Sequence, residues 1–387
     1  MIEGVKLMST QGVELETTAH DFTEPPPALK VLIFGTFERR RVPRIDVYEE
    51  GLRAHGVEIC TLNEPLPLNQ DERLAVLRRP WLVHRLIGPM LGAWLRLWRS
   101  ARDAKPDVVL VGYMAHFDVV LARLRFRQAV IAIDHLVFAE ETAQDRRAAL
   151  PVRLLLRILD RLAISLADVI VVDTREHKAM VPARRQADVA VVPIGVSNGW
   201  LSTEARPVSQ SPMKVLFFGI FTPLQGTEVI AEAIRLTADE VPAIFFTLIG
   251  TGQDYATARR IVGQDDRVSW FDWVDPHDLP AVATEHDVIL GIFGEGDKAL
   301  RVVPNKVVQG AAAGLAVVTS DTATQRDLFG SSAVYVPSGS AVALAEALSV
   351  LAADPVRVGE LGRCGRELIA RERSPSVVIE PLLSLVR

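Results

Sequence analysis

Cationic side chains gather in one segment of the sequence, residues 291–314. The segment opens as an apolar run and continues as a Gly-containing loop that carries Lys298 and Arg301; a short helical pattern follows. Lys306 falls in the first turn of that helix, where the helix dipole disfavours a cation unless an anion is close. The free N–H groups of such a turn also bind phosphate. The segment therefore predicts a phosphate site formed by Lys298, Arg301 and Lys306.

The predicted helix has clear boundaries and one polar face. Pro304 and Asn305 are typical of a helix start, and Gly314 is typical of a helix end. Asn305 and Gln309 are four residues apart and share a face, which could offer amide groups to ribose hydroxyls. The alternative for the whole segment is a surface loop neutralised by neighbouring acidic residues.

Two histidines and one turn in the first half of the chain are further candidates. His116 follows an apolar strand pattern, and Asp134-His135 ends the next one. Ligands of parallel sheets bind beyond the carboxyl ends of the strands, so we expect these side chains to face a cleft. The Gly35-Thr36 turn would give an acceptor or a donor phosphate access to the backbone. A purely structural role is the alternative for each histidine.

The strands that would position these residues are indicated first by a repeat in the sequence. Residues 30–37 (KVLIFGTF) and 214–221 (KVLFFGIF) differ at only two positions, and each is an apolar strand pattern that ends in Gly. Further buried-strand patterns alternate with helical patterns such as 229–238, 307–313 and 341–353, which favours two doubly wound parallel sheets of the Rossmann type. The remaining predicted strands are 57–62, 108–112, 129–134, 169–173, 189–193, 243–250, 268–271, 288–293, 316–320 and 333–336.

Length and composition agree with this division. A chain of 387 residues exceeds one ordinary core. We predict a loose leader at 1–29, an acceptor domain at 30–200, a linker within 197–212 and a donor domain at 213–372. A last helix at 373–387 would pack back on the first domain. A net charge of −5 argues against a nucleic-acid partner. Two distant cysteines predict neither a disulfide framework nor a zinc site, and favour a reduced, cytoplasmic setting.

Residues 73–105 combine basic and aromatic side chains. Seven arginines and a lysine are interspersed with three tryptophans and several leucines, against one acidic residue. This pattern is typical of an interfacial helix, and we expect Pro80 and Pro89 to break it into pieces. Peripheral contact with a membrane would make a lipid-linked saccharide the acceptor, whereas helices packed on the first sheet would leave a soluble acceptor open. No run is long enough to predict a membrane span.

The second half resembles retaining glycosyltransferase family 4, which has the GT-B fold of two Rossmann-like domains. The resemblance covers residues 215–377, and residues 167–174 and 192–196 of the first half are compatible with it. The motifs that carry it are FGIFTPLQG at 218–226, LIGTG at 248–252, EHDV at 285–288, the helix at 304–314 and VVTSD at 317–321.

The sequence departs from this family's pattern where the donor diphosphate and ribose are bound. Ile220 and Gln225 stand where the family has Arg and Lys, and Arg301 and Gln309 stand where it has two glutamates. Two interpretations follow. Either this is a divergent subgroup in which Lys298, Arg301 and Lys306 supply the positive charge, or it is a non-catalytic relative.

The resemblance implies the transfer of a sugar from a nucleoside diphosphate sugar to an acceptor hydroxyl, with retention at the anomeric carbon, in polysaccharide, glycolipid or other glycoconjugate synthesis. Fixed cations and a helix N-terminus would stabilise the leaving phosphate without a metal or cofactor. His116 matches the approximate place of a family histidine near the donor sugar, and Asp134 and His135 remain candidates on the acceptor side. The implied donor-binding residues are Gly219, Thr222, Gln225, Gly226, Gly250, Gly252, Pro304, Asn305 and Gln309.

Other functions stay open on the same fold. A nucleotide-sugar epimerase would need more acids and bases in the cleft than the sequence offers. A catalytically silent subunit would bind a partner transferase. Asp272 and Asp275 flank Trp273 at a suggestive spacing, but solvated loop carboxylates explain them better than a metal site.

Overall fold

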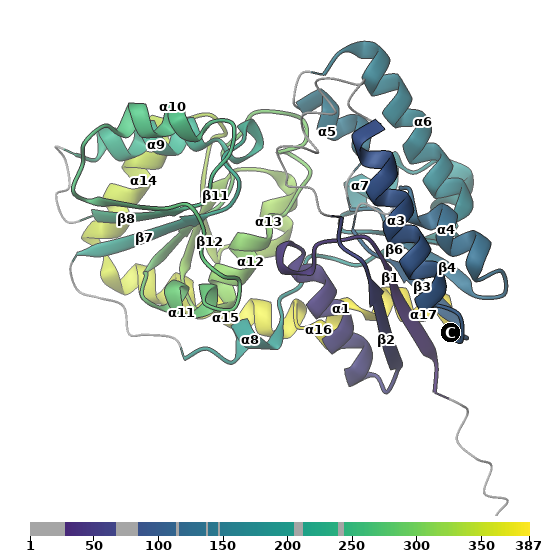
Figure 1. The fold of residues 1–387 in the computed structure, drawn as a ribbon. Coiled ribbons are helices and arrows are strands. Elements are labelled where there is room, and N and C mark those ends of the chain that lie inside the picture. The colour runs from purple at the N-terminus through teal and green to yellow at the C-terminus, as the bar shows by residue number, and fades with distance from the viewer. Residues whose placement is uncertain are drawn as a thin grey trace, which may run out of the picture.

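The structure is a computed structural model that describes residues 28–66, 84–113, 116–136, 138–145, 148–204, 212–238 and 244–387. The predicted leader lies outside these residues except for 28 and 29, as does the part of the basic and aromatic stretch before residue 84. The described residues form two parallel six-stranded sheets with helices on both faces (Figure 1).

The first sheet has the strand order β2-β1-β3-β4-β5-β6, and all its pairs are parallel. Because neighbouring side chains of a strand point to opposite faces, each strand contributes side chains to two hydrophobic cores, one on each face of the sheet. Leu32 and Phe34 pack with α3, α4 and α6, whereas Val31 and Ile33 pack with α1 and α17. The elements are β1 (Lys30–Gly35), α1 (Pro43–Ala54), β2 (Glu58–Asn63), α3 (His84–Ser100), β3 (Val108–Val111), α4 (Asp118–Arg125), β4 (Val130–Asp134), α5 (Ala139–Asp145), α6 (Leu150–Leu166), β5 (Val169–Val172), α7 (Arg175–Met180) and β6 (Val189–Val191).

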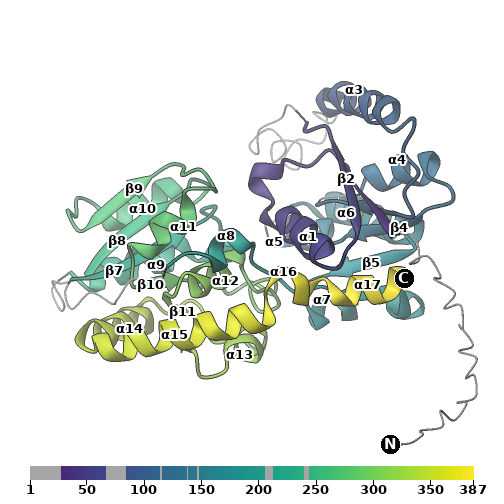
Figure 2. The same cartoon turned by 90° about the horizontal axis from the view of Figure 1, so that it is seen from below.

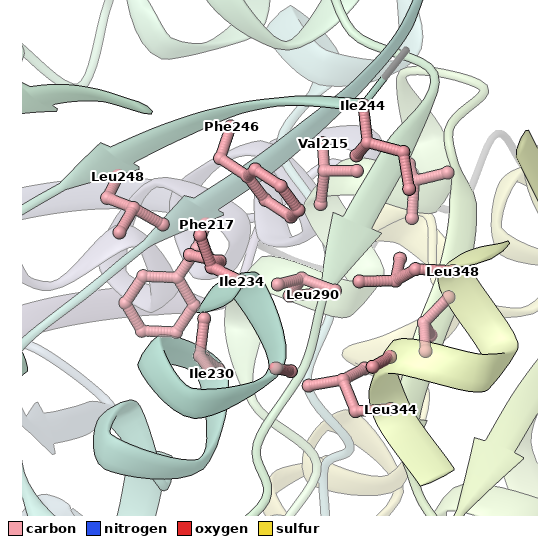
Figure 3. Packing of buried hydrophobic residues seen from close by; sticks show 14 of the residues in the cluster. Val215, Phe217, Ile230, Ile234, Ile244, Phe246, Leu248, Leu290, Leu344 and Leu348 are labelled. Carbon is pink, nitrogen blue, oxygen red and sulfur yellow. The ribbon is translucent and has the colours of Figure 1, made fainter. Parts of the chain in front are cut away.

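The second sheet has the order β12-β11-β10-β7-β8-β9. Large apolar side chains of β7, β8 and β10 meet α9 and α14, and Phe217, Phe246 and Leu348 are among the residues of this core (Figure 3). The elements are α8 (Asn198–Leu201), β7 (Met213–Phe218), α9 (Thr227–Leu236), β8 (Ile244–Ile249), α10 (Tyr255–Val262), β9 (Val268–Phe271), α11 (Leu279–Thr284), β10 (Val288–Leu290), α12 (Asn305–Ala312), β11 (Ala316–Ser320), α13 (Ala323–Phe329), β12 (Ala333–Val336), α14 (Ala341–Ala353) and α15 (Pro355–Glu372).

Both sheets contain a switch point, where the strand order reverses and a crevice opens at the carboxyl ends. In the first sheet it lies between β1 and β3, and in the second between β7 and β10. The repeated KVLxFG segments form β1 and β7, so each copy ends at a switch point. This confirms the predicted fold class.

The chain passes between the halves twice, and the two passes touch. After α15, the short helices α16 (Pro375–Val378) and α17 (Glu380–Val386) run back under the first sheet (Figure 2). Val378, Ile379 and Leu382 are buried in the same cluster as Val31 of β1. The Val196 N–H of the first pass donates to the Arg373 carbonyl of the second at 3.0 Å.

One local prediction is wrong. Pro89 lies inside the single helix α3 and does not break it. A proline removes one backbone hydrogen bond, and its ring crowds the preceding turn. The eleven residues after it, 90–100, complete the helix, and Leu97 anchors it in the hydrophobic cluster that contains Leu32 and Phe34.

Candidate active site

A cleft of about 1350 Å³ lies between the two halves. Its second-half wall is built by the loops that follow β7 and β8 and by the start of α12, and its first-half wall by α1 and the residues after β3, β4 and β5. Of the predicted donor-binding residues, it is lined by Gly219, Thr222, Gln225, Gly250, Pro304, Asn305 and Gln309. The cleft thus lies where the two switch points face each other.

Backbone contacts hold the three loops of the donor side together. The Gly219 N–H donates to the Ile249 carbonyl at 2.9 Å, and the Phe293 N–H donates to the Gln225 carbonyl at 3.1 Å. A Cβ on Gly250 would lie 1.9 Å from the Gly219 carbonyl oxygen, at a φ of +126°. Only glycine allows so close an approach, so the loop motifs of the sequence are explained by packing.

Lys306 is a buried lysine on the floor of this cleft. Its side chain is 5% exposed, its Nζ donates to Gln225 Oε1 at 2.5 Å, and Nζ lies 3.6 Å from the centre of the Phe217 ring. Burial lowers the pKa of the Lys306 ammonium well below its usual value. Among the described residues no carboxylate pairs with it. An anion in the cleft would supply the missing charge.

The start of α12 also favours an anion in the cleft. Pro304 is its N-cap, and no acidic residue lies in its first turn. Pro304, Asn305 and Lys306 all line the cleft, so the unbonded N–H groups of the first turn reach it. Gln309, one turn later, is 7% exposed and also lines it.

The three predicted phosphate-binding cations do not form one group. Lys298 lines the cleft, and its Nζ donates to Thr142 Oγ1 of the first half at 3.0 Å. Arg301 pairs with Glu141 of α5 at 3.4 Å and lines a second cavity of about 1470 Å³, together with Gly226. The sequence could not show this, because Glu141 is 160 residues away along the chain.

His116 and His135 lie together, but below the surface. His116 is 5% exposed, and its Nε2 lies 2.8 Å from Asp160 Oδ1 of α6. His135 is 2% exposed, and its Nε2 has no hydrogen-bond partner and lies 3.6 Å from the same oxygen. Burial, with His116 close by, lowers the pKa of His135 to about 3. Neither histidine lines the cleft, contrary to the expectation that both face it.

These three side chains are also the one described group that could hold a metal ion. One ligand atom from each of His116, His135 and Asp160 lies within 4.8 Å of the others. Imidazole nitrogens with a carboxylate suit zinc. The Asp160 carboxylate already accepts from the backbone N–H groups of Ala139 and Glu140, which ties α5 to α6 without any ion.

Asp134 has a structural role instead of an acceptor role. It is 2% exposed, and its Oδ1 accepts from Arg44 Nε at 3.1 Å and from Tyr48 Oη at 2.9 Å. Burial raises the pKa of the Asp134 carboxyl. Arg44 also donates to the Val192 carbonyl at 2.7 Å, so the pair locks α1 to the sheet.

The Gly35-Thr36 turn is filled from within the protein. Asp118 Oδ2 accepts from the Thr36 N–H at 2.7 Å and from Thr36 Oγ1 at 2.8 Å. Asp118 is 5% exposed, and its other oxygen accepts from Trp94 Nε1. The prediction that this turn offers its backbone to a ligand is therefore wrong, because an internal carboxylate occupies that position.

Asp173 is a cleft residue that the sequence reasoning missed. It follows β5 and lines the cleft, and its Oδ1 lies 2.5 Å from His177 Nδ1. The rule that singled out Asp134 at the end of β4 applies equally to Asp173 at the end of β5. On the other side, His177 Nε2 lies 3.7 Å from Glu141. Burial is outweighed by these two carboxylates, which raise the pKa of His177 to about 9.

This histidine predicts a loss of stability at alkaline pH. A pKa of about 9 in the folded protein, against about 6.5 when unfolded, gives a contribution that is complete below pH 6.5. It is lost as pH rises through 9, and its full size is on the order of 3 kcal/mol. We expect urea denaturation to show the wild type more stable than His177→Asn at pH 6, with the difference shrinking by pH 10. An exposed control, His277→Asn, should show no such trend; a constant difference for His177→Asn would contradict the assignment.

Two family models match the sequence. "Glycosyl transferases group 1" matches residues 212–354, and "Glycosyltransferase Family 4" matches residues 49–198. Together they span both halves and the cleft between them. No curated protein matches the sequence.

Solved structures share the fold at low identity. Sucrose-phosphate synthase from Thermosynechococcus elongatus is 15% identical, with a TM-score of 0.67, 92% of this chain covered and 98% of the other. HepE from Anabaena in complex with UDP-glucose is 13% identical, with a TM-score of 0.63 and the same coverage. TarM from S. aureus, in a complex that contains UDP, is 12% identical, with a TM-score of 0.58, 76% of this chain covered and 59% of the other.

Proposed function

Because this chain belongs to the family 4, group 1 glycosyltransferases and has their GT-B fold, we propose that it transfers a sugar from a nucleoside diphosphate sugar to an acceptor hydroxyl with retention. The observation that carries the proposal is Lys306. It is a buried lysine on the cleft floor, beside a helix N-terminus, with no anionic partner among the described residues.

In the proposed reaction, the bond between the sugar's anomeric carbon and the diphosphate oxygen breaks, and its electron pair stays on that oxygen. The acceptor oxygen bonds to the same carbon, and its proton passes to the departing diphosphate. Negative charge therefore grows on the leaving phosphate. Two fixed positive features lie at this wall of the cleft: the Lys306 ammonium and the N–H groups of the first turn of α12. Lys298 at the rim is the third source of positive charge.

The departures from the family pattern support exchange of the phosphate-binding cation over its loss. Gln225 stands at the position of the family's lysine, and its Oε1 accepts from Lys306 Nζ at 2.5 Å. A cation is thus present at this loop, but it comes from α12. Gln309 keeps an amide on the helix face where the resemblance places ribose binding.

For the acceptor, we propose a lipid-linked saccharide met by a cytoplasmic enzyme at the inner face of a membrane. The support is α3, whose described outer side carries Leu91, Leu95 and Trp98 at 44–57% exposure beside Arg99. None of the described helices is both long and apolar enough to span a bilayer.

A donor panel tests the proposed reaction. We expect at least one of a set of UDP-, GDP- and dTDP-sugars to raise the melting temperature, since a ligand at one hundred times its Kd stabilises the folded state by about 2.7 kcal/mol. The matching nucleoside, which has no phosphates, should give a much smaller shift. Product analysis by NMR then reads the anomeric configuration.

The outcomes separate the two interpretations of the sequence. Stabilisation by a donor followed by sugar transfer supports the proposal. If no member of the panel stabilises the protein, the proposed donor site is wrong and a silent subunit becomes the better interpretation.

A further inference from the structure

Exposed apolar side chains of the first half gather on one side of it. Within residues 28–196, every described large hydrophobic residue that is exposed lies on α3, on α4 or immediately before it, or on α6; on the other face of the first sheet, Leu385 of α17 is exposed. These three helices cover the same face of the first sheet, and α4 packs against both of the others. The residues are Ile87, Leu91, Leu95, Trp98, Phe117, Leu124, Leu150, Leu154, Leu155, Ile158 and Leu162.

Helix α6 carries the densest part of this surface. Leu150, Leu154 and Ile158 follow one another at intervals of four, and Leu155 and Leu162 extend the row. At about 100° per residue these five lie on one side of the helix. They are 47–73% exposed, so the row faces solvent although it is built like a core face. An exposed apolar area of this extent marks an interaction site.

The charged side chains on the outer surface of these three helices are arginines. Helices α3, α4 and α6 contain three, two and three arginines. Their acidic residues are Asp118 and Asp160, and both are buried. Acidic residues of neighbouring segments pair with three of these arginines: Glu64 with Arg96, Asp168 with Arg123 and Glu140 with Arg157. The arginines outnumber these acids, so the face has an excess of positive charge in a protein with a net charge of −5. Leucine, tryptophan and arginine on one face complement a bilayer that contains anionic lipids.

A second row of α6 connects this surface with the site. Arg153, Arg157 and Arg161 lie at intervals of four next to the leucine row and line the cavity of about 1470 Å³. Arg157 pairs with Glu140, which Arg153 approaches to 3.5 Å. Lys298 of the second half lines this cavity and the donor cleft alike. One helix thus borders both an apolar outer surface and a cavity next to the donor cleft that is lined by side chains of both charges.

We propose that α3, α4 and α6 form a docking face for an anionic lipid bilayer, and that α6 guides an amphiphilic acceptor from it. The acceptor's apolar chain lies along the leucine row, and its polar group enters the cavity that Arg153, Arg157 and Arg161 border. This rests on the proposed function for the reaction itself; the docking face does not depend on it.

Vesicle flotation tests the docking face. The full chain is mixed with vesicles of phosphatidylcholine and phosphatidylglycerol at a ratio of 3:1, or of phosphatidylcholine alone. We expect binding to the mixed vesicles that weakens at least tenfold without the anionic lipid. A Leu155→Glu/Ile158→Glu variant should lose at least tenfold in affinity for the mixed vesicles. The matched control is Val350→Glu/Val356→Glu, which changes two equally exposed apolar residues of the second half.

Three results would overturn the proposal: no binding by the wild type, equal binding by the α6 variant, or equal loss in the control. Arg157→Gln/Arg161→Gln should reduce the preference for anionic over neutral vesicles by at least threefold. Far-UV circular dichroism and the melting temperature establish that each variant is folded. The donor-induced melting shift should persist in the α6 variant, so a failed docking face and a failed donor site give different results.

Discussion

Lys306→Met is expected to lower kcat/KM by about 100- to 1000-fold while leaving the protein folded. At an effective dielectric of about 20, a cation 4 Å from a phosphate charge contributes about 4 kcal/mol, and removal of one preorganised donor costs about 2.7–4 kcal/mol. Methionine has a similar length and suits a side chain that is 5% exposed against the Phe217 ring. Initial rates with the donor found by the panel measure the effect.

The stability of the same variant provides an independent check. An ammonium without a carboxylate partner among the described residues is costly to bury, so the free energy of unfolding of Lys306→Met should equal or exceed that of the wild type. The control is Lys214→Met, at the opposite end of strand β7 from the cleft. It should keep its rate and its donor-induced melting shift. A Lys306→Met variant with an unchanged rate removes the proposed phosphate site.

Arg44→Met is expected to lower the free energy of unfolding by about 3–5 kcal/mol. Removing one partner of a buried ion pair leaves the other charge without compensation. Asp134 is 2% exposed, and the substitution would also release the Val192 carbonyl that Arg44 now holds. Urea denaturation at neutral pH measures the loss. The matched control, Arg53→Met on the same helix, removes a guanidinium that is 59% exposed and should cost less than about 1 kcal/mol.

A double variant distinguishes the effect of the lost ion pair from the effect of lost side-chain packing. Arg44→Met/Asp134→Leu removes both charges and should recover most of the stability lost in the single variant. If Asp134 acted on the acceptor instead, Arg44→Met would leave stability intact and change only the rate. That result would contradict the structural role assigned to Asp134.

The sequence predicted what local patterns determine. Continuous apolar runs identified the strands, because parallel strands are buried on both faces and need no alternation. The start of α12 at Asn305 could also be predicted from the local sequence, because Pro304 allows only a limited set of backbone conformations there. These signals lie within a few residues of the feature they specify.

The side-chain pairs that join distant parts of the chain could not be predicted from the sequence. Arg44 and Asp134 are 90 residues apart, and Asp118 reaches back 82 residues to Thr36. A carboxylate after a strand looks the same in the sequence whether it faces a cleft or an internal arginine. The solvent-facing leucines of α6 were missed for a related reason: a leucine row at helical spacing normally faces a core.

The paired crossings at Val196 and Arg373 limit how the two halves can move. Because both connections pass through one hydrogen-bonded point, a change in the angle between the halves pivots there, and displacement grows with distance from that point. Figure 1 shows α5 and α16 at opposite ends of the space between the halves. The Lys298–Thr142 and Arg301–Glu141 contacts involve α5 and so act on a long lever arm. A small rotation about the Val196–Arg373 hydrogen bond would separate these two contacts first. They therefore hold the two halves together at the end that lies farthest from the hinge.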